Sequence, residues 1–237
     1  DAERLIVAAR ASGAFLRVNE PALFHAPYRK LKHLINDMEI GEVCAIRIHA
    51  NLCGKGGCGP MPEMLKRNPL LHPALDVFAL AVELGGEADS VNTYMSKFTN
   101  TKGGRAVVGV KYKAEGCYGC LDLTYAPHTA IRSDCIPCED TIEVAGTDGI
   151  IWARHFHGKM TEEPWLEVRR GKKHYTIGIG SGMELSWTDA LRASAKHFAS
   201  RAAAGKQPRL SGKDALYSLR FLLAAEKSAR DNTEIKF

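Results

Sequence analysis

The 237-residue sequence lacks long hydrophobic segments and extended blocks of charge of one sign. Its apolar runs, such as residues 221–225, are a few residues long, whereas a membrane-spanning helix needs about 20. The net charge of +5 is spread along the chain and is densest at residues 169–173, which is too diffuse to indicate nucleic-acid binding. We therefore expect neither a membrane nor a nucleic acid as partner.

No basic-then-apolar leader follows Asp1, so we expect no export signal. The sequence has seven cysteines, an odd number, which without export favours reduced thiols in the cytoplasm over a disulfide framework. Hydrophobic residues make up 45% and charged residues 25%, which is typical of globular proteins and excludes disordered and fibrous classes. The length is sufficient for one large domain or two small ones.

The first third of the chain alternates between helical and strand-like patterns. Apolar spacing and turn residues predict a helix at 1–12, a short strand at 14–19, a helix from Pro27, a strand at 42–52 and a helix at 70–84. The intervening stretch 53–62 is so rich in glycine and proline that we expect a loop.

The middle of the chain reads as successive strands and the end as two helices. We expect strands at 90–99, 105–113, 118–125, 141–145, 149–156, 165–169 and 174–179, and helices at 187–204 and 211–229. Elements segregated in this way predict an α+β fold, in which a large, mostly antiparallel open sheet carries helices on one face.

Several motifs occur together in a characteristic order. They are Phe24-His-Ala-Pro-Tyr28, Glu39-Ile-Gly-Glu-Val43, the stretch 72–85, Gly146-Thr-Asp-Gly149, Gly205-Lys-Gln-Pro208 and Ser211-Gly-Lys-Asp-Ala-Leu216. In this order they resemble the Gfo/Idh/MocA family of NAD(P)-dependent oxidoreductases across nearly the whole chain. The resemblance implies that residues 1–20 are the last helix and strand of a truncated, Rossmann-type nucleotide-binding domain. Residues 21–237 would form the C-terminal substrate-binding and oligomerisation domain.

Two features of that family are absent from these residues: its Gly-rich dinucleotide turn and its Glu-Lys-Pro motif. The Gly-rich stretches at 54–59 and 178–182 lack the strand–turn–helix context that a pyrophosphate needs. NAD or NADP is therefore expected to be bound mainly by the missing N-terminal domain. The chain alone is expected to be inactive.

His72 and Asp76 are the candidate catalytic residues, because they lie four apart on one face of an expected helix. Proton transfer from an alcohol needs a group that titrates near neutral pH, and histidine does so without perturbation. The family's helix presents its Asp before its His, so either the order is reversed here or the register is shifted by a few residues. This departure leaves altered or lost activity open. An exposed polar pair at a helix end is the alternative interpretation.

Three further residues are candidates for substrate binding. His25 and Tyr28 follow the segment that, in the family, leads out beside the nicotinamide and sugar site. Lys55 lies in a stretch, 53–60, where family members build a wall of the substrate site. A satisfied surface histidine and a plain connecting loop are the alternatives.

The cysteines Cys117, Cys120, Cys135 and Cys138 form two Cys-x-x-Cys pairs whose spacing is close to that of a four-cysteine structural zinc site. Against this, residues three apart in a strand point to opposite faces. The family carries ordinary apolar residues at these positions, so the resemblance implies cysteines that serve as small apolar residues. Both interpretations stay open at this point.

The resemblance implies hydride exchange between NAD(P) and a sugar, a cyclitol or a related secondary alcohol. It also implies a homodimer or homotetramer paired through the open sheet face. The alternative is a non-catalytic sheet domain for assembly or sugar binding, with or without a structural zinc.

Overall fold

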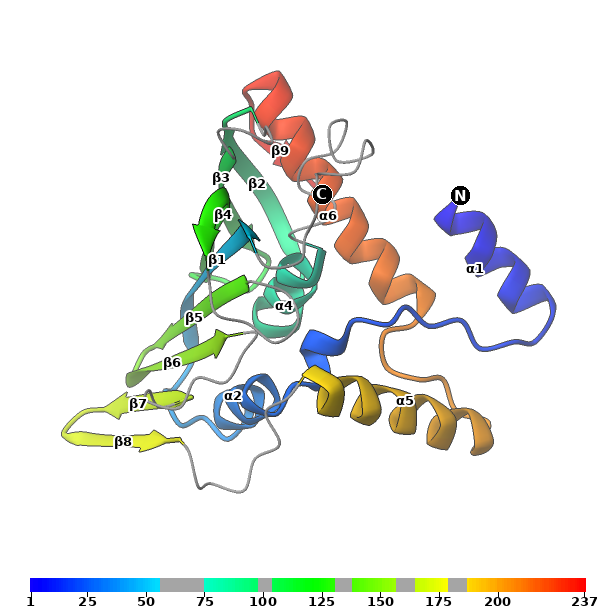
Figure 1. The fold of residues 1–237 in the computed structure, drawn as a ribbon, viewed down its shortest axis with the longest axis horizontal. Helices are drawn as coiled ribbons and strands as arrows, with labels where there is room; N and C mark the ends of the chain where they lie inside the picture. Colours follow the sequence, from blue (N-terminus) through cyan, green and yellow to red (C-terminus); the bar gives the residue numbers. More distant parts are fainter. Residues whose placement is uncertain (56–74, 98–103, 131–137, 157–164, 179–186) are drawn as a thin grey trace.

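The computed structural model describes residues 1–55, 75–97, 104–130, 138–156, 165–178 and 187–237. Figure 1 shows a large sheet on one side of the molecule and helices on the other. The helical elements are α1 (Ala2–Ala11), the 3-10 helix η1 (Pro21–Phe24), α2 (Ala26–Asn36), α4 (Leu75–Gly85), α5 (Trp187–Ala203) and α6 (Gly212–Asp231). None of the described helices is long and apolar enough to cross a membrane.

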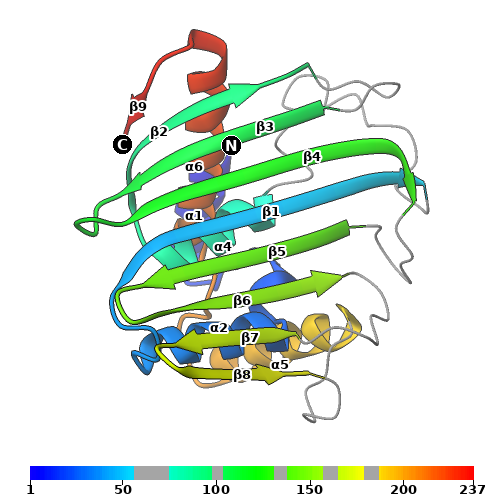
Figure 2. The same ribbon diagram turned by 90° about the vertical axis from the view of Figure 1, so that its left-hand side faces the viewer.

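The sheet has nine strands in the order β8-β7-β6-β5-β1-β4-β3-β2-β9 (Figure 2). They are β1 (Val43–Lys55), β2 (Ala88–Met95), β3 (Gly104–Tyr112), β4 (Tyr118–Ala130), β5 (Cys138–Gly146), β6 (Gly149–Phe156), β7 (Leu166–Arg170), β8 (Lys173–Ile177) and β9 (Ile235–Lys236). Among the strands that the structure describes, only β1 and β4 pair in parallel, and every other neighbouring pair is antiparallel. The mostly antiparallel sheet expected from the sequence is therefore confirmed.

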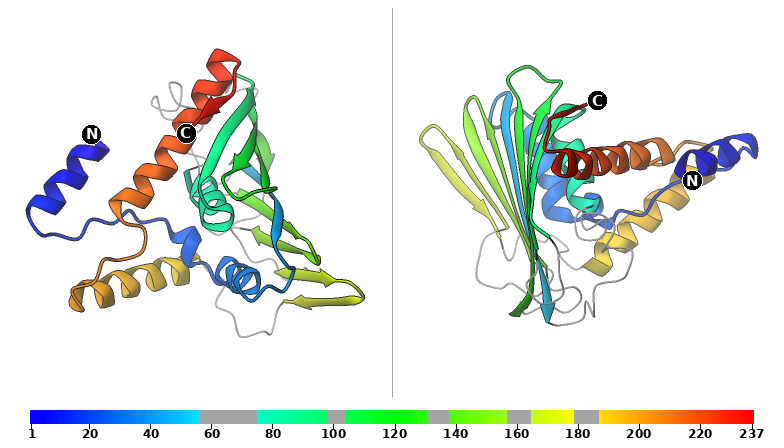
Figure 3. Two further views of the ribbon diagram at one scale, coloured as in Figure 1. Left: turned by 180° about the vertical axis from the view of Figure 1, so that it is seen from behind. Right: turned by 90° about the horizontal axis from the view of Figure 1, so that it is seen from above.

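Helices cover one face of this sheet and leave the other open, as Figure 3 shows from above. The side chains of β3 alternate regularly between buried and exposed positions along its whole length. This is the period of two that a half-covered sheet requires. The prediction of helices on a single face is thus confirmed as well.

Aromatic residues anchor the two central helices to each other beneath the sheet. Phe78 of α4 and Phe221 of α6 are fully buried, and their ring centroids lie 4.9 Å apart in an edge-to-face arrangement. Phe237 packs edge-on against Phe221 at 5.6 Å. This cluster holds α4 against α6, and Asp76 lies two residues before Phe78 in the first turn of α4.

Two sequence expectations near the start of the chain are wrong. Residues 14–19 do not form a strand, because only Arg17 pairs there, through a single bridge to Ser211. The strand β1 runs on to Lys55, so residues 53–55 of the expected loop are strand, and the rest of that stretch lies outside the described residues. Along residues 53–55 the neighbouring β4 continues to pair with β1, up to Ala130 opposite Lys55, and these backbone bonds outweigh the weak strand propensity of Gly54.

The start of α6 carries a capping box. The Ser211 hydroxyl accepts from the Asp214 backbone N–H, and the Asp214 carboxylate accepts from the Ser211 N–H at 2.8 Å. Replacing Ser211 with Ala is expected to lower the free energy of unfolding by about 1 kcal/mol, because it leaves helix N–H groups unsatisfied. Urea denaturation measures this, with Ser12→Ala at the end of α1 as a control that removes a hydroxyl without removing an N-cap.

Candidate functional site

The candidate site lies where several strands end at one edge of the sheet. The parallel strands β1 and β4 finish together, with Lys55 opposite Ala130. The strand β5 begins at the same edge, with Cys138 opposite Leu52, and β6 ends there at Phe156, opposite Glu139. Residues carried by strand ends or by helices beside them converge at such an edge, as is common for substrate sites on sheets.

Three carboxylates from separate elements interact electrostatically beside this edge. Asp76 stands in the first turn of α4 and is partly buried, and one of its oxygens accepts from the Val77 N–H at 2.9 Å. Asp140 is buried on β5, one residue pair from the end of its ladder with β6. Glu20 directly precedes η1. We call these three residues the carboxylate cluster.

The cluster changes the acid–base properties of Asp76. Burial, followed by the negative charges of Asp140 and Glu20, raises the pKa of the Asp76 carboxyl to about 7. Burial also raises the pKa of Glu20. A carboxyl that titrates near neutral pH can both take up and release a proton under working conditions, which is the property a general acid–base group needs.

His25 and Tyr28, the predicted substrate residues, lie together at the start of α2. His25 is the N-cap residue of this helix and is fully buried, and Tyr28 is 3% exposed. Their rings meet edge-on, with centroids 5.6 Å apart. The structure therefore brings the two residues together as a packed pair, and their contact with substrate stays a prediction.

The structure describes the remaining predicted site residues only in part. His72 lies outside the described residues. Lys55 is the last residue of β1, and its side chain is not among those described.

The sequence analysis missed Glu20 and Asp140. Asp140 does carry a signal, since it shares the inward face of β5 with Ile142 and Val144, where an acidic residue is out of place. Glu20 has no comparable signal, because it lies outside any periodic pattern.

The zinc prediction is not supported by the strand register. Cys120 lies opposite Arg47 of β1, whereas Cys138 lies opposite Leu52, five residues further along the same strand. That offset is about 16 Å, while the sulfur ligands of one zinc lie within about 5 Å of each other. Cys117 directly precedes β4 and is buried, whereas Cys120 on β4 is partly exposed. Cys135 lies outside the described residues, and those that are described contain no group of three metal ligands.

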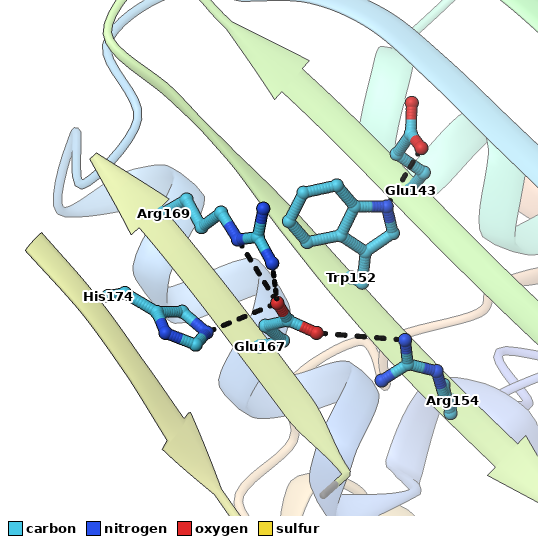
Figure 4. A network of polar contacts seen from close by, with 6 residues as sticks. All are labelled: Glu143, Trp152, Arg154, Glu167, Arg169 and His174. Carbon is cyan, nitrogen blue, oxygen red and sulfur yellow. Dashed lines mark hydrogen bonds and ion pairs between the residues drawn. The ribbon is translucent and has the colours of Figure 1, made fainter. Parts of the chain in front are cut away.

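A second polar cluster lies on the open face of the sheet (Figure 4). Glu167 of β7 accepts from Arg169 at 2.8 Å and contacts His174 of β8 at 3.1 Å and Arg154 of β6 at 3.6 Å. The Arg169 guanidinium also lies over the Trp152 ring, 5.3 Å from its centroid, and Trp152 donates to Glu143 at 2.8 Å. These contacts join the outer strands β6, β7 and β8 by cross-strand pairs.

The charge on Glu167 is expected to add to stability. Desolvation acts to raise its pKa, but hydrogen bonds and positive charge from Arg169, His174 and Arg154 outweigh this, and its pKa is lowered. The ionised Glu167 therefore stabilises the fold fully above the pKa of about 4.3 that a glutamate has in the unfolded chain. This stabilisation is lost as pH falls through the lower pKa of Glu167 in the folded protein.

Glu167→Gln should lower the free energy of unfolding by about 1 kcal/mol at pH 7 and by less at pH 3. Urea denaturation at both pH values measures this. The control is Glu115→Gln in the exposed β3–β4 turn. An equal loss of unfolding free energy in the two variants would mean that the ion pairs of Glu167 do not contribute to stability.

Comparison with protein-family models finds no match to this sequence, and comparison with curated proteins finds none either. Solved structures do match. An oxidoreductase from Agrobacterium radiobacter in complex with NAD+, L-tartaric acid and magnesium aligns over 99% of this chain and 68% of its own, with a TM-score of 0.74 and 17% identity.

Two further structures match in the same way. Aldose-aldose oxidoreductase from Caulobacter crescentus, complexed with glycerol, aligns over 100% of this chain and 68% of its own, with a TM-score of 0.76 and 16% identity. A 3-ketoreductase from Actinomadura kijaniata in complex with NADP aligns over 96% of this chain and 65% of its own, with a TM-score of 0.68 and 19% identity. The chain therefore has the fold of the Gfo/Idh/MocA-type oxidoreductases, as its sequence motifs indicated.

Proposed function

We propose that this chain is the substrate-binding and proton-transferring part of an oxidoreductase that exchanges hydride between NAD(P) and a sugar, a cyclitol or a related secondary alcohol. The observation that carries the proposal is the Asp76 carboxyl, whose pKa is raised to about 7 at the edge where β1, β4 and β6 end. Similar structures with NAD+ or NADP bound support the choice of cofactor.

Oxidation of a secondary alcohol removes a hydride from carbon and a proton from oxygen. A nicotinamide, when bound, would supply the acceptor for the hydride and its electron pair. Asp76, as a carboxylate, takes the hydroxyl proton and so becomes the neutral acid, and in reduction it returns that proton. A pKa near 7 leaves this exchange close to balanced at neutral pH.

The carboxylate cluster also suits a substrate with several hydroxyl groups. Glu20 and Asp140 carry acceptor oxygens near enough to raise the pKa of Asp76, and hydroxyl hydrogens are the donors that such oxygens need. The described elements contain no Gly-rich turn between a strand and a helix, so they fit the proton-transfer side of the reaction better than the binding of a pyrophosphate.

The test is oxidation of a panel of sugars and cyclitols by the full-length protein, with NAD+ and NADP+ in turn and nicotinamide reduction followed by absorbance. We expect activity with at least one polyhydroxylated secondary alcohol. Its kcat/KM should rise with pH and level off above an inflection near 7, as Asp76 becomes the carboxylate. Activity that is absent throughout the panel, or independent of pH between 5 and 9, would contradict the proposal.

We further propose that two copies of the chain pair through the open sheet face. This face carries Tyr94, Val107 and Tyr118, which are 70%, 39% and 58% exposed, and the register places Tyr94 beside Val107. Large side chains on a flat, uncovered sheet are typical of an interface. Sedimentation analysis should show a dimer or tetramer that Val107→Lys dissociates, while Val7→Lys on the exposed helix α1 leaves it intact.

A further inference from the structure

A cleft with an excess of positive charge lies between α2, the last turns of α4 and the segment that leads into α6. Its volume is about 310 Å3, within the range typical of small-molecule sites. Arg29 and Lys32 of α2 and Arg209 line it, together with a single carboxylate, that of Glu83. We call it the basic cleft.

Two of its cations are held in place by contacts with the end of α4. The Lys32 ammonium donates to the Glu83 backbone oxygen at 2.6 Å, and the Arg209 guanidinium pairs with the Glu83 carboxylate at 2.6 Å. An ammonium has three N–H donors and a guanidinium five, so both keep donors for a ligand. The two head groups are thus positioned without being saturated.

Further contacts fix Arg209 itself. Its backbone N–H donates to the His197 ring at 3.1 Å, and its guanidinium lies 5.8 Å from the centroid of the Phe24 ring. The positive charge around this residue also acts on His197, whose pKa is lowered by burial and then by a group of arginines: Arg17, Arg201, Arg209 and Arg29. The cations of the cleft therefore belong to a wider region of positive potential.

The charge and the walls of the cleft together select a class of ligand. Three cations face one carboxylate, which leaves two positive charges uncompensated. A phosphomonoester carries about −1.5 to −2 charges near pH 7, whereas a carboxylate carries only one. Leu23, Leu80 and Leu84 also line the cleft and offer apolar surface to the carbon portion of such a ligand.

We propose that the basic cleft binds a small organic phosphomonoester, with the phosphate held by Arg29, Lys32 and Arg209. The site is separate from the carboxylate cluster, since Glu83 lies seven residues beyond Asp76 on α4, or about 10 Å along the helix. Both sites share α4, so a ligand in the cleft contacts the helix that carries Asp76. The inference does not rest on the oxidoreductase activity.

The test is calorimetric titration of the protein with glycerol 3-phosphate, with inorganic phosphate and with glycerol. We expect saturable binding of glycerol 3-phosphate, weaker binding of inorganic phosphate and none of glycerol. Arg29→Gln should weaken binding about tenfold, because it removes a charged donor from an exposed position that folding does not need. Lys32→Gln should weaken it as well.

The matched control is Lys30→Gln, which removes the same charge from the neighbouring position on α2, outside the cleft lining. Equal weakening by Lys30→Gln and Arg29→Gln would overturn the proposal in favour of general charge attraction, and so would the absence of saturable binding. Asp76→Asn should leave phosphate binding unchanged. A loss of binding in that variant would overturn the separation of the two sites, whereas a loss of oxidation alone bears only on the oxidoreductase proposal.

Discussion

Replacing Asp76 with Asn is expected to lower kcat/KM for alcohol oxidation by about 10²–10⁴-fold in the full-length protein. An amide has nearly the same shape as a carboxyl but cannot accept the hydroxyl proton, so the loss reports proton transfer rather than packing. The pH dependence with its inflection near 7 should also disappear. Steady-state kinetics between pH 5 and 9 measures both effects.

The same substitution should make the protein more stable at alkaline pH. The unfolded Asp has a pKa of about 3.9, whereas burial and the neighbouring carboxylates raise the folded-state pKa to about 7. Between these values the native state holds a proton that the unfolded state has lost, so stability falls as pH rises through this window. Asn cannot ionise, and the gain at pH 8 should be on the order of 2 kcal/mol, with almost none at pH 4.

Asp37→Asn, exposed at the end of α2, is the matched control for both measurements. It should change neither kcat/KM for alcohol oxidation nor the pH dependence of the free energy of unfolding. If Asp76→Asn retained activity within threefold of the parent protein, Asp76 would not be the proton acceptor. The candidate His72 would then be the next residue to replace.

Much of the sheet could be predicted because local patterns decide it. The strands of the hairpins at Glu115–Gly116 and Thr147–Asp148 alternate clearly, and their turn residues mark where each strand reverses. The parallel pairing of β1 with β4 has no such local signal, since it joins residues more than 70 positions apart, such as Ala45 and Tyr118. Sequence patterns therefore gave the strands but not their order in the sheet.

The candidate site was less predictable for the same reason. Asp76 stood out through its spacing on a helix, but its proton affinity comes from Glu20 and Asp140, which approach it only in the folded chain. The zinc prediction finds no support for a similar reason, because Cys120 and Cys138 lie opposite residues of β1 that are five positions apart. Spacing alone can identify pairs within one element, whereas a site built from several elements depends on register.

The largest stability effect is expected from Phe78, which holds α4 against α6. Phe78→Ala should lower the free energy of unfolding by about 3–5 kcal/mol, because the ring is fully buried and its removal leaves a cavity beside Phe221. Chemical denaturation measures this loss. The control Leu223→Ala truncates a side chain of α6 that is 42% exposed and should cost less than about 1.5 kcal/mol.

Packing of Phe78 also affects the position of Asp76, since Phe78 lies half a helical turn after Asp76 on the same helix. The milder variant Phe78→Leu keeps most of the buried volume and should cost about 1.5 kcal/mol or less, so it remains folded for functional measurements. We expect the α4 first turn to loosen in this variant and the pH inflection of alcohol oxidation to move from about 7 toward the ordinary range of an aspartate. An unchanged pH inflection in Phe78→Leu would show that the carboxylate cluster is held by the sheet edge alone. A loss of unfolding free energy in Phe78→Ala no larger than that in Leu223→Ala would contradict the packing of α4 on α6.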